Sequence, residues 1–242
     1  MKADLNDRIN ERKIIGSDFE EVYPYFSKVS KSICKIITPT LKGSGFFIKY
    51  LIDNEYFYYL MSNEHVIKEN IIKNKDKIYV YYDNEFENLE IILDKEKRYI
   101  RTFLDINIDA TIIQILPEDK INEVYFLSPE LDNLDPHSFK GKRIYIPQYP
   151  FGKKLKNARG IISDIFDNYG FIHLASSEPG SSGSPIFLND SIKVIGIHKQ
   201  GHKNKMENYG DFIFPIYNIL KNEKKIYKRK LNWKKEIIIL EN

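Results

Sequence analysis

The sequence contains one cysteine, Cys34, among its 242 residues. A disulfide within the chain is therefore impossible, which argues against a secreted protein held together by disulfide bonds. The first eight residues are polar and charged, and they lack the apolar segment that defines a signal peptide. No apolar run approaches the length of a membrane span. These absences favour a soluble protein, and we expect a cytoplasmic location.

Recognisable cofactor sites are also missing from the sequence. One cysteine and five scattered histidines make no recognisable zinc site, so we expect no metal. The Gly-x-x-x-x-Gly-Lys loop that cradles nucleotide phosphates is absent as well. The formal net charge is only +3, which implies no polyanionic partner for the molecule as a whole. We expect no cofactor of either kind.

What the sequence has in abundance is strand-forming residues. Aromatic residues make up 14% of the chain, and Ile and Val recur throughout, which favours strands over helices. Apolar runs predict two groups of strands, separated by a linker over residues 117–140. The first group comprises residues 32–37, 43–48, 56–61, 77–83, 89–93, 99–104 and 109–116, and the second comprises residues 143–147, 159–166, 169–175, 185–188, 193–198 and 212–216. The prediction is an all-β protein with two halves of similar size.

Both ends of the chain differ from this pattern. Apolar residues at helical spacing predict a short amphipathic helix over residues 18–29, and a second helix is expected to begin at residues 216–222. Residues 221–242 carry eight Lys or Arg against three Glu, which is typical of a tail that contacts nucleic acid or an anionic membrane. The alternative is a solvated helix whose apolar side chains dock on the protein. We favour the alternative, because apolar residues interleave with the charges and no binding motif accompanies them.

One segment places a serine in a glycine-flanked loop before an apolar strand. Its sequence is Glu178-Pro179-Gly180-Ser181-Ser182-Gly183-Ser184-Pro185. Glycine permits backbone angles that other residues resist. The loop could therefore hold the Ser182 hydroxyl at the surface of a sheet and turn the N–H groups of Gly180 and Ser182 toward one point, as an oxyanion hole requires. A hairpin turn explains the same residues equally well, so the segment needs support from elsewhere.

A serine nucleophile needs an imidazole to take its proton and a carboxylate to orient that imidazole. His65 is the best candidate base, because it ends an apolar strand where a ring can face a cleft. Asp109 directly precedes a buried strand in the same half, and Asp105 is the alternative carboxylate. Of the other histidines, we expect His137 on the surface, His173 in cross-strand packing and His202 in a charged loop.

These residues, in the order His65, Asp109 and Ser182, resemble the trypsin/chymotrypsin-like serine peptidases. The closest resemblance is to their disulfide-free branch, which includes the HtrA and glutamyl-endopeptidase-like enzymes. Five motifs carry it: Gly43-Ser44-Gly45-Phe46-Phe47-Ile48, Ser62-Asn63-Glu64-His65-Val66-Ile67, Asp109-Ala110-Thr111-Ile112, Gln148-Tyr149-Pro150-Phe151-Gly152 followed by Gly160-Ile161-Ile162-Ser163, and Gly180-Ser181-Ser182-Gly183-Ser184-Pro185. The match departs from the family's pattern at Ser181, where the family usually has Asn.

The resemblance implies two antiparallel six-stranded β-barrels, with short helices at the two ends and the active site in the cleft between the barrels. It implies an N-terminal extension over residues 1–30, a peptidase domain over residues 31–220 and a basic tail over residues 221–242. Within the domain, the barrels would cover about 31–120 and about 140–220. The implied activity is a serine endopeptidase that acts on polypeptides, with the catalytic triad His65, Asp109 and Ser182 and an oxyanion hole from Gly180 and Ser182.

The strand Val194-Ile195-Gly196-Ile197-His198 would line the pocket for the P1 residue, the one before the scissile bond. Glutamyl endopeptidases carry a similar Gly-Ile-His, and Ser177 falls where that family often has a pocket hydroxyl. A histidine at the pocket wall can donate a hydrogen bond to a carboxylate or an amide, which predicts Glu or Gln at P1. The His198 ring could equally well make a purely structural hydrogen bond, because a few substitutions are enough to change the specificity of such a pocket.

Two alternatives to a constitutively active enzyme stay open at the level of sequence. One is a catalytically inactive trypsin-like fold that acts as a protein-binding module, although a scaffold has no physical need for all three triad groups. The other is an enzyme kept latent by residues 1–30 lying over the cleft. The sequence makes no prediction about the oligomeric state.

Overall fold

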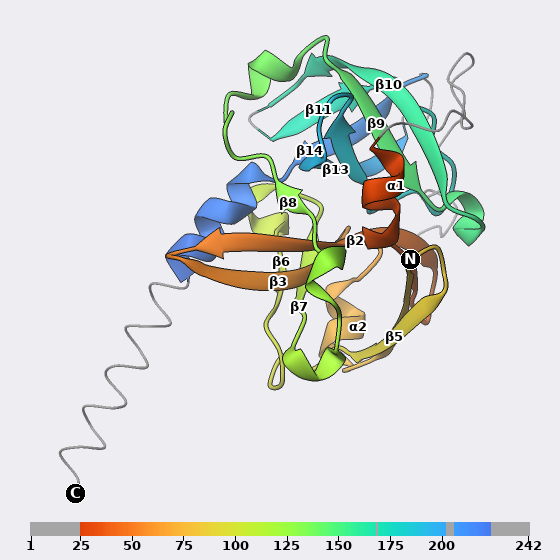
Figure 1. Cartoon of the computed structure of the whole chain (residues 1–242), viewed down its shortest axis with the longest axis vertical. Coiled ribbons are helices and arrows are strands. Elements are labelled where there is room, and N and C mark those ends of the chain that lie inside the picture. The colour runs from red at the N-terminus through yellow and green to blue at the C-terminus, as the bar shows by residue number, and fades with distance from the viewer. Residues whose placement is uncertain (1–24, 168, 202–205, 224–242) are drawn as a thin grey trace, which may run out of the picture.

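The computed structural model describes residues 25–167, 169–201 and 206–223. Within this part of the chain, two seven-stranded sheets hold nearly all of the regular structure, and the helices are short (Figure 1). The predicted all-β class with two β halves is therefore confirmed. Most of the basic tail, residues 18–24 of the predicted N-terminal helix and His202 lie outside the described residues.

The first sheet is built from the N-terminal half of the chain. Its strand order is β5 (Glu87–Ile92), β4 (Lys77–Tyr82), β1 (Ile33–Ile37), β2 (Lys42–Ile52), β3 (Glu55–Ser62), β7 (Thr111–Gln114) and β6 (Ile100–Thr102). Every neighbouring pair in this sheet is antiparallel. Strand β7 is shorter than the run predicted from residue 109, and Asp109 lies just before it rather than within it.

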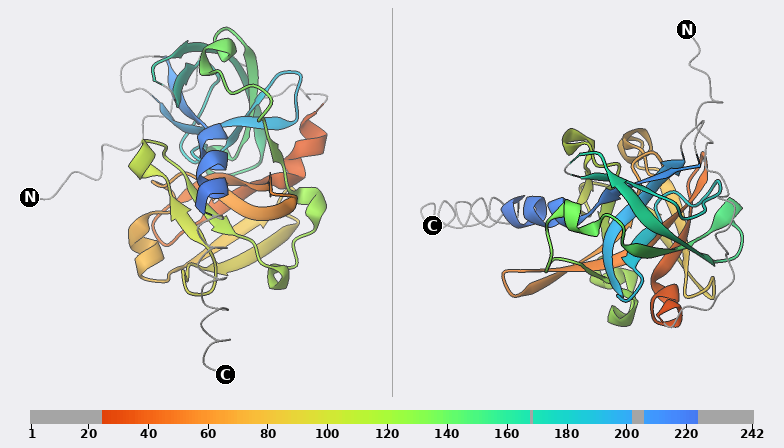
Figure 2. Two further views of the ribbon diagram at one scale, coloured as in Figure 1. Left: turned by 90° about the vertical axis from the view of Figure 1, so that its left-hand side faces the viewer. Right: turned by 90° about the horizontal axis from the view of Figure 1, so that it is seen from above.

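The second sheet closes on itself. Its order is β12 (Pro185–Leu188), β9 (Arg143–Gln148), β10 (Lys156–Ile165), β11 (Gly170–His173), β14 (Asn208–Phe212), β13 (Lys193–Gly201) and β8 (Ser128–Pro129). An additional pairing between β12 and β13 joins the ends of six of these strands into an antiparallel barrel. The short β8 lies outside the ring and pairs with β13 in parallel. The fold is that of a chymotrypsin-like double barrel, seen from two further directions in Figure 2.

The prediction of a strand over residues 212–216 was wrong. The last strand, β14, ends at Phe212, and a helix begins at residue 214 and continues to the last described residue, 223. The apolar run Phe212-Ile213-Phe214-Pro215-Ile216 fits a buried strand and a buried helix start equally well by periodicity. Pro215 decides between them, because proline is favourable in the first turn of a helix and cannot donate to a sheet.

Short helices fill the connections between strands. They are α1 (Phe26–Val29), α2 (Glu69–Lys73) and the 3-10 turns η2 (Ser30–Ser32), η3 (Leu104–Ile106), η4 (Pro117–Asp119), η5 (Glu123–Tyr125), η6 (Pro136–Phe139) and η7 (Pro150–Gly152). No helix among the residues that the structure describes has the length and hydropathy needed to cross a membrane.

In the part of the chain that the structure describes, three clusters of buried apolar side chains hold the fold together. One lies within the first sheet and another within the closed barrel, around Phe171 and Phe212. The largest joins side chains of both halves, among them Phe46 and Tyr50 of β2 and the stacked rings of Tyr145 and Phe187, 4.8 Å apart. Burial of each large apolar side chain contributes about 1.5–3 kcal/mol. The shared cluster therefore fixes the two halves against each other, and with them any site at their junction.

A glycine of the closed barrel tests this packing. A Cβ at Gly160, on β10, would lie 2.6 Å from the carbonyl carbon of Leu174, which belongs to backbone that cannot move aside. We predict that Gly160→Ala lowers the free energy of unfolding by about 2–3 kcal/mol, as overpacking does. The matched control, Gly141→Ala, meets no atom within 4 Å but has a φ of +79°, so only backbone strain of about 1 kcal/mol is expected. Equal losses in urea denaturation would contradict this account of the barrel.

Candidate active site

The loop over residues 178–184 is built from consecutive turns. The Ser181 N–H donates to the Glu178 carbonyl at 2.9 Å, and the Ser184 N–H donates to the Ser181 carbonyl at 3.1 Å. Gly180 and Gly183 have φ angles of +96° and +91°, which other residues rarely adopt. The two glycines therefore permit the abrupt changes of direction that leave Ser182 between them.

The first sheet clamps this loop through Ser44, a buried residue of β2. The Ser44 N–H donates to the Ser182 carbonyl at 2.8 Å, and the Ser44 hydroxyl donates to the Gly180 carbonyl at 2.8 Å. The same hydroxyl accepts the Tyr149 N–H at 3.0 Å, and the Ser62 hydroxyl donates to the Ser44 carbonyl at 2.7 Å. The loop belongs to the second half of the chain, so these bonds tie it to the first half.

Strand β13 holds the loop from the other side. The Gly183 N–H donates to the His198 carbonyl at 3.0 Å, and the His198 N–H donates to the Ser184 carbonyl at 2.8 Å. The Ser182 hydroxyl donates to the Lys199 carbonyl at 3.1 Å. Ser182 thus sits on a backbone that is hydrogen-bonded to both halves of the molecule.

The turn after β9 orients the peptide before Gly180. The Phe151 N–H donates to the Pro179 carbonyl at 2.5 Å. In a trans peptide the N–H points away from the C=O, so the Gly180 N–H points away from Phe151. A Cβ at Gly180 would lie 2.8 Å from both the Gly152 nitrogen and the Tyr149 oxygen, which makes glycine the residue that this close packing requires.

His65 and Asp109 form a hydrogen-bonded pair. The His65 Nδ1 lies 2.6 Å from the Asp109 Oδ2, and the His65 backbone N–H donates to the Oδ1 at 3.1 Å. Burial alone would raise the pKa of Asp109, but the hydrogen bond and the charge of His65 outweigh it and hold that pKa below its usual value. An ionised carboxylate only accepts hydrogen bonds, so Nδ1 carries a proton, and in the neutral ring this tautomer leaves the lone pair on Nε2. The His65 side chain is 33% exposed and that of Asp109 only 10%.

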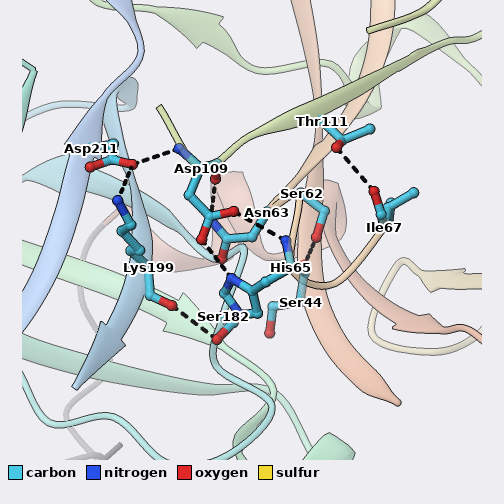
Figure 3. A network of polar contacts seen from close by, with 10 residues as sticks. All are labelled: Ser44, Ser62, Asn63, His65, Ile67, Asp109, Thr111, Ser182, Lys199 and Asp211. Atoms are coloured by element: carbon cyan, nitrogen blue, oxygen red, sulfur yellow. Dashed lines mark hydrogen bonds and ion pairs between the residues drawn. The ribbon is translucent and has the colours of Figure 1, made fainter. Parts of the chain in front are cut away.

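The Asp109 backbone is fixed as firmly as its side chain. Its carbonyl accepts from the Asn63 amide at 2.6 Å, and its N–H donates to the Asp211 Oδ2 at 2.8 Å (Figure 3). Asn63 belongs to the turn that carries His65, whereas Asp211 lies on β14 in the closed barrel. The carboxylate is therefore held between the two halves.

The structure gathers the three residues predicted as a triad into one polar network. Figure 3 shows the His65 ring beside the Asp109 carboxylate and pointing toward Ser182. The backbone supports this placement, because a Cβ at Gly43 would lie 2.7 Å from Val66, the neighbour of His65, and 3.3 Å from the Ser182 carbonyl. The segments that carry His65 and Ser182 are thus separated by little more than one glycine.

The alternative carboxylate, Asp105, lies elsewhere. It pairs with Arg101 at 2.9 Å, and its side chain is exposed. His137 is exposed in η6, as expected from its linker position.

Two predicted pocket residues, His198 and Ser177, are buried. The His198 Nδ1 lies 3.0 Å from the Nε2 of His173, which is also fully buried. The expectation that His173 only packs across strands was therefore incomplete, because it is hydrogen-bonded to His198. The buried Ser177 hydroxyl has no hydrogen-bond partner among the residues that the structure describes.

Several residues of the network were not predicted from the sequence. Ser44 and Asn63 stand inside motifs quoted above, but nothing in their spacing revealed which groups they bind. Asp211 carried no signal, because it falls in a strand that the apolar pattern placed too late. Among the described residues, no cluster of three or more His, Cys, Asp or Glu could hold a metal ion.

A family model matches the sequence of this chain, and solved structures match its fold. A family model described as a trypsin-like peptidase domain matches residues 43–197. A search of curated proteins found no match.

Three solved structures show the same fold. The serine endoprotease from Yersinia pestis is 16% identical, with a TM-score of 0.61, and the match covers 84% of this chain and 67% of that one. Deg5 is 18% identical, with a TM-score of 0.58 and coverage of 80% and 88%. The active form of the Rv3671c protease from M. tuberculosis is 17% identical, with a TM-score of 0.56 and coverage of 78% of each chain. The family model spans well over half of the sequence, and the chain therefore belongs to the trypsin-like peptidase domain family and is a serine peptidase.

Proposed function

We propose that this peptidase cleaves polypeptides through an acyl-enzyme formed on Ser182. The observation that carries the proposal is the short hydrogen bond from His65 Nδ1 to Asp109, in a network that also holds the Ser182 backbone. It leaves the Nε2 lone pair free to act as a base. A serine hydroxyl is a weak nucleophile until such a base takes its proton.

The proposed reaction has two halves. In the first, His65 takes the Ser182 proton as the hydroxyl oxygen attacks the peptide carbonyl, and then delivers that proton to the leaving amine as the C–N bond breaks. In the second, His65 takes a proton from water as the water oxygen attacks the ester, and returns it to Ser182 as the acid product leaves. Asp109 stays ionised throughout and stabilises the imidazolium.

The N–H groups of Gly180 and Ser182 are the proposed oxyanion hole. Anchoring of the Pro179 carbonyl by Phe151 supports this, because it fixes the direction of the Gly180 N–H. The Ser44 bonds to the carbonyls of Gly180 and Ser182 hold the rest of the loop. Donors fixed before the reaction stabilise a developing oxyanion without the cost of reorientation.

We further propose that the enzyme prefers Glu, or Gln, at P1. Burial, and then the neighbouring His198, keep the pKa of His173 well below its usual value, so His173 is neutral. Its Nδ1 accepts the Ala175 N–H at 3.3 Å, so its Nε2 carries the proton and donates to His198 Nδ1. His198 must then carry its own proton on Nε2, which makes that atom a donor suited to a carboxylate or an amide.

Covalent labelling with a fluorophosphonate tests the nucleophile. We expect the wild-type protein to be labelled and Ser182→Ala to lose all labelling, because the probe bonds to the activated serine oxygen. Asp109→Asn should slow labelling on the order of 10³-fold or more, through loss of the correct imidazole tautomer. The control Ser138→Ala, in η6 of the linker, should label normally. A folded wild-type protein that does not react would instead indicate an inactive, protein-binding module.

Peptide-library cleavage tests the P1 preference. Peptides with Glu at P1 should be cleaved faster than those with Leu or Arg. In His198→Phe that preference should fall about 10- to 100-fold, since a hydrogen bond to a charged group contributes about 1.5–3 kcal/mol. His137→Gln, an exposed histidine, is the control. Cleavage after Leu or Arg with Glu ignored would overturn the preference while leaving the triad untouched.

The neutral state of His173 predicts a specific pH dependence of stability. The unfolded chain binds a proton at His173 below about pH 6.5, whereas the folded protein does not, so the free energy of unfolding falls as the pH drops through that value. Urea denaturation should show wild type losing about 1 kcal/mol more than His173→Gln between pH 7 and pH 5.5. Parallel losses in the two proteins would show that His173 is protonated in the folded state.

A further inference from the structure

Lys199 occupies a bulge in β13 beside the proposed active site. The pairing of β13 with β14 matches His198 to Gly210 and Gln200 to Tyr209, so the register shifts at Lys199. Bulges of this kind re-aim a side chain. Here the Lys199 carbonyl accepts from the Ser182 hydroxyl, while its ammonium group reaches Asp211 at 3.3 Å. One residue thus contacts the proposed nucleophile and a buried carboxylate.

Asp211 is a second carboxylate directly behind Asp109. Its side chain is only 2% exposed, against 27% for that of Lys199. The Oδ2 that receives the Lys199 ammonium is the same atom that accepts the Asp109 N–H (Figure 3). Burial raises the pKa of Asp211, and the Lys199 charge opposes that rise. An unpaired carboxylate at this depth would be strongly disfavoured.

These contacts place two acids and two bases in one partly desolvated cluster. The charged groups that act on Asp109 and Asp211 are His65, Lys199 and the two acids themselves. Asp211 adds a negative charge that favours the imidazolium of His65, and Lys199 adds a positive charge that disfavours it. Both act on the imidazole at a distance through the field of their charges, while Asp211 also holds the Asp109 backbone.

We infer that Lys199 and Asp211 are positioning residues that hold the Asp109 backbone between the barrels and balance the charge around the His65–Asp109 pair. The inference rests on the proposed roles of His65 and Asp109. It adds two residues to that site, and neither was a candidate on sequence grounds for this purpose. A balancing pair has a property that a structural ion pair lacks: removal of either member alone shifts the protonation of the base, and the two shifts have opposite signs.

The test is the pH dependence of the fluorophosphonate labelling rate, which needs no peptide substrate. Labelling requires unprotonated His65, so the acid limb of the profile reports its protonation. In Lys199→Met the midpoint of that limb should move up by about 0.5–1 pH unit, because two acids then favour the imidazolium. In Asp211→Asn it should move down by a similar amount, while the amide oxygen can still accept the Asp109 N–H. The double variant should return close to the wild-type midpoint.

Matched controls separate charge from structure. Lys199→Arg keeps the positive charge at this position. Lys193→Met removes a positive charge elsewhere on the same strand, where Lys193 forms an exposed ion pair with Asp132. Neither variant should move the midpoint. If Lys199→Met fails to fold, Asp211→Asn and Lys199→Arg decide the question. Midpoints that stay fixed, or that move in the same direction in both single variants, would overturn the inference. Wild-type protein that does not label at all would overturn the proposed function itself.

Discussion

The hydrogen bonds of Ser44 are the constraint on which the site depends. A trypsin-like active site takes its base and its nucleophile from different halves of the chain, so something must fix one half to the other near the site. Ser44 does this from β2 by binding the carbonyls of Gly180 and Ser182, with its own carbonyl held by Ser62. A shared apolar core sets the halves together, but only directional bonds of this kind fix a loop closely enough for catalysis.

The electrostatics of the site follow from the same junction. Asp109 lies where the halves meet, with its carbonyl bound by Asn63 from one side and its N–H by Asp211 from the other. A carboxylate buried there is stable only because donors surround it, and His65 is the strongest of them. The second acid and Lys199 then complete a cluster in which charges of opposite sign offset each other. The tautomer of His65 and the position of Ser182 are consequences of one packing arrangement rather than separate features.

The sequence predicted the β class and the two halves, because these depend on local apolar periodicity. It also singled out His65 and Asp109, which lie in the polar network with Ser182, because short motifs contain them. It failed where tertiary contacts decide. The apolar run around Phe212 placed the last strand four residues late and so concealed Asp211. The link between His173 and His198 joins residues 25 apart in sequence on separate strands, and no local pattern encodes it. Ser44 was visible only as part of a motif, since its partners lie more than 100 residues away.

In the proposed mechanism, the Ser182 oxygen is the group that bonds to the substrate carbonyl, and every other role in the site depends on this. The most direct measurement is a crystal structure of the protein soaked with a peptide aldehyde that carries Glu at P1. We expect a tetrahedral adduct on Ser182, with its oxygen within hydrogen-bond distance of the Gly180 and Ser182 N–H groups and Nε2 of His65 beside it. An aldehyde bound without a covalent bond, or bonded to another residue, would contradict it.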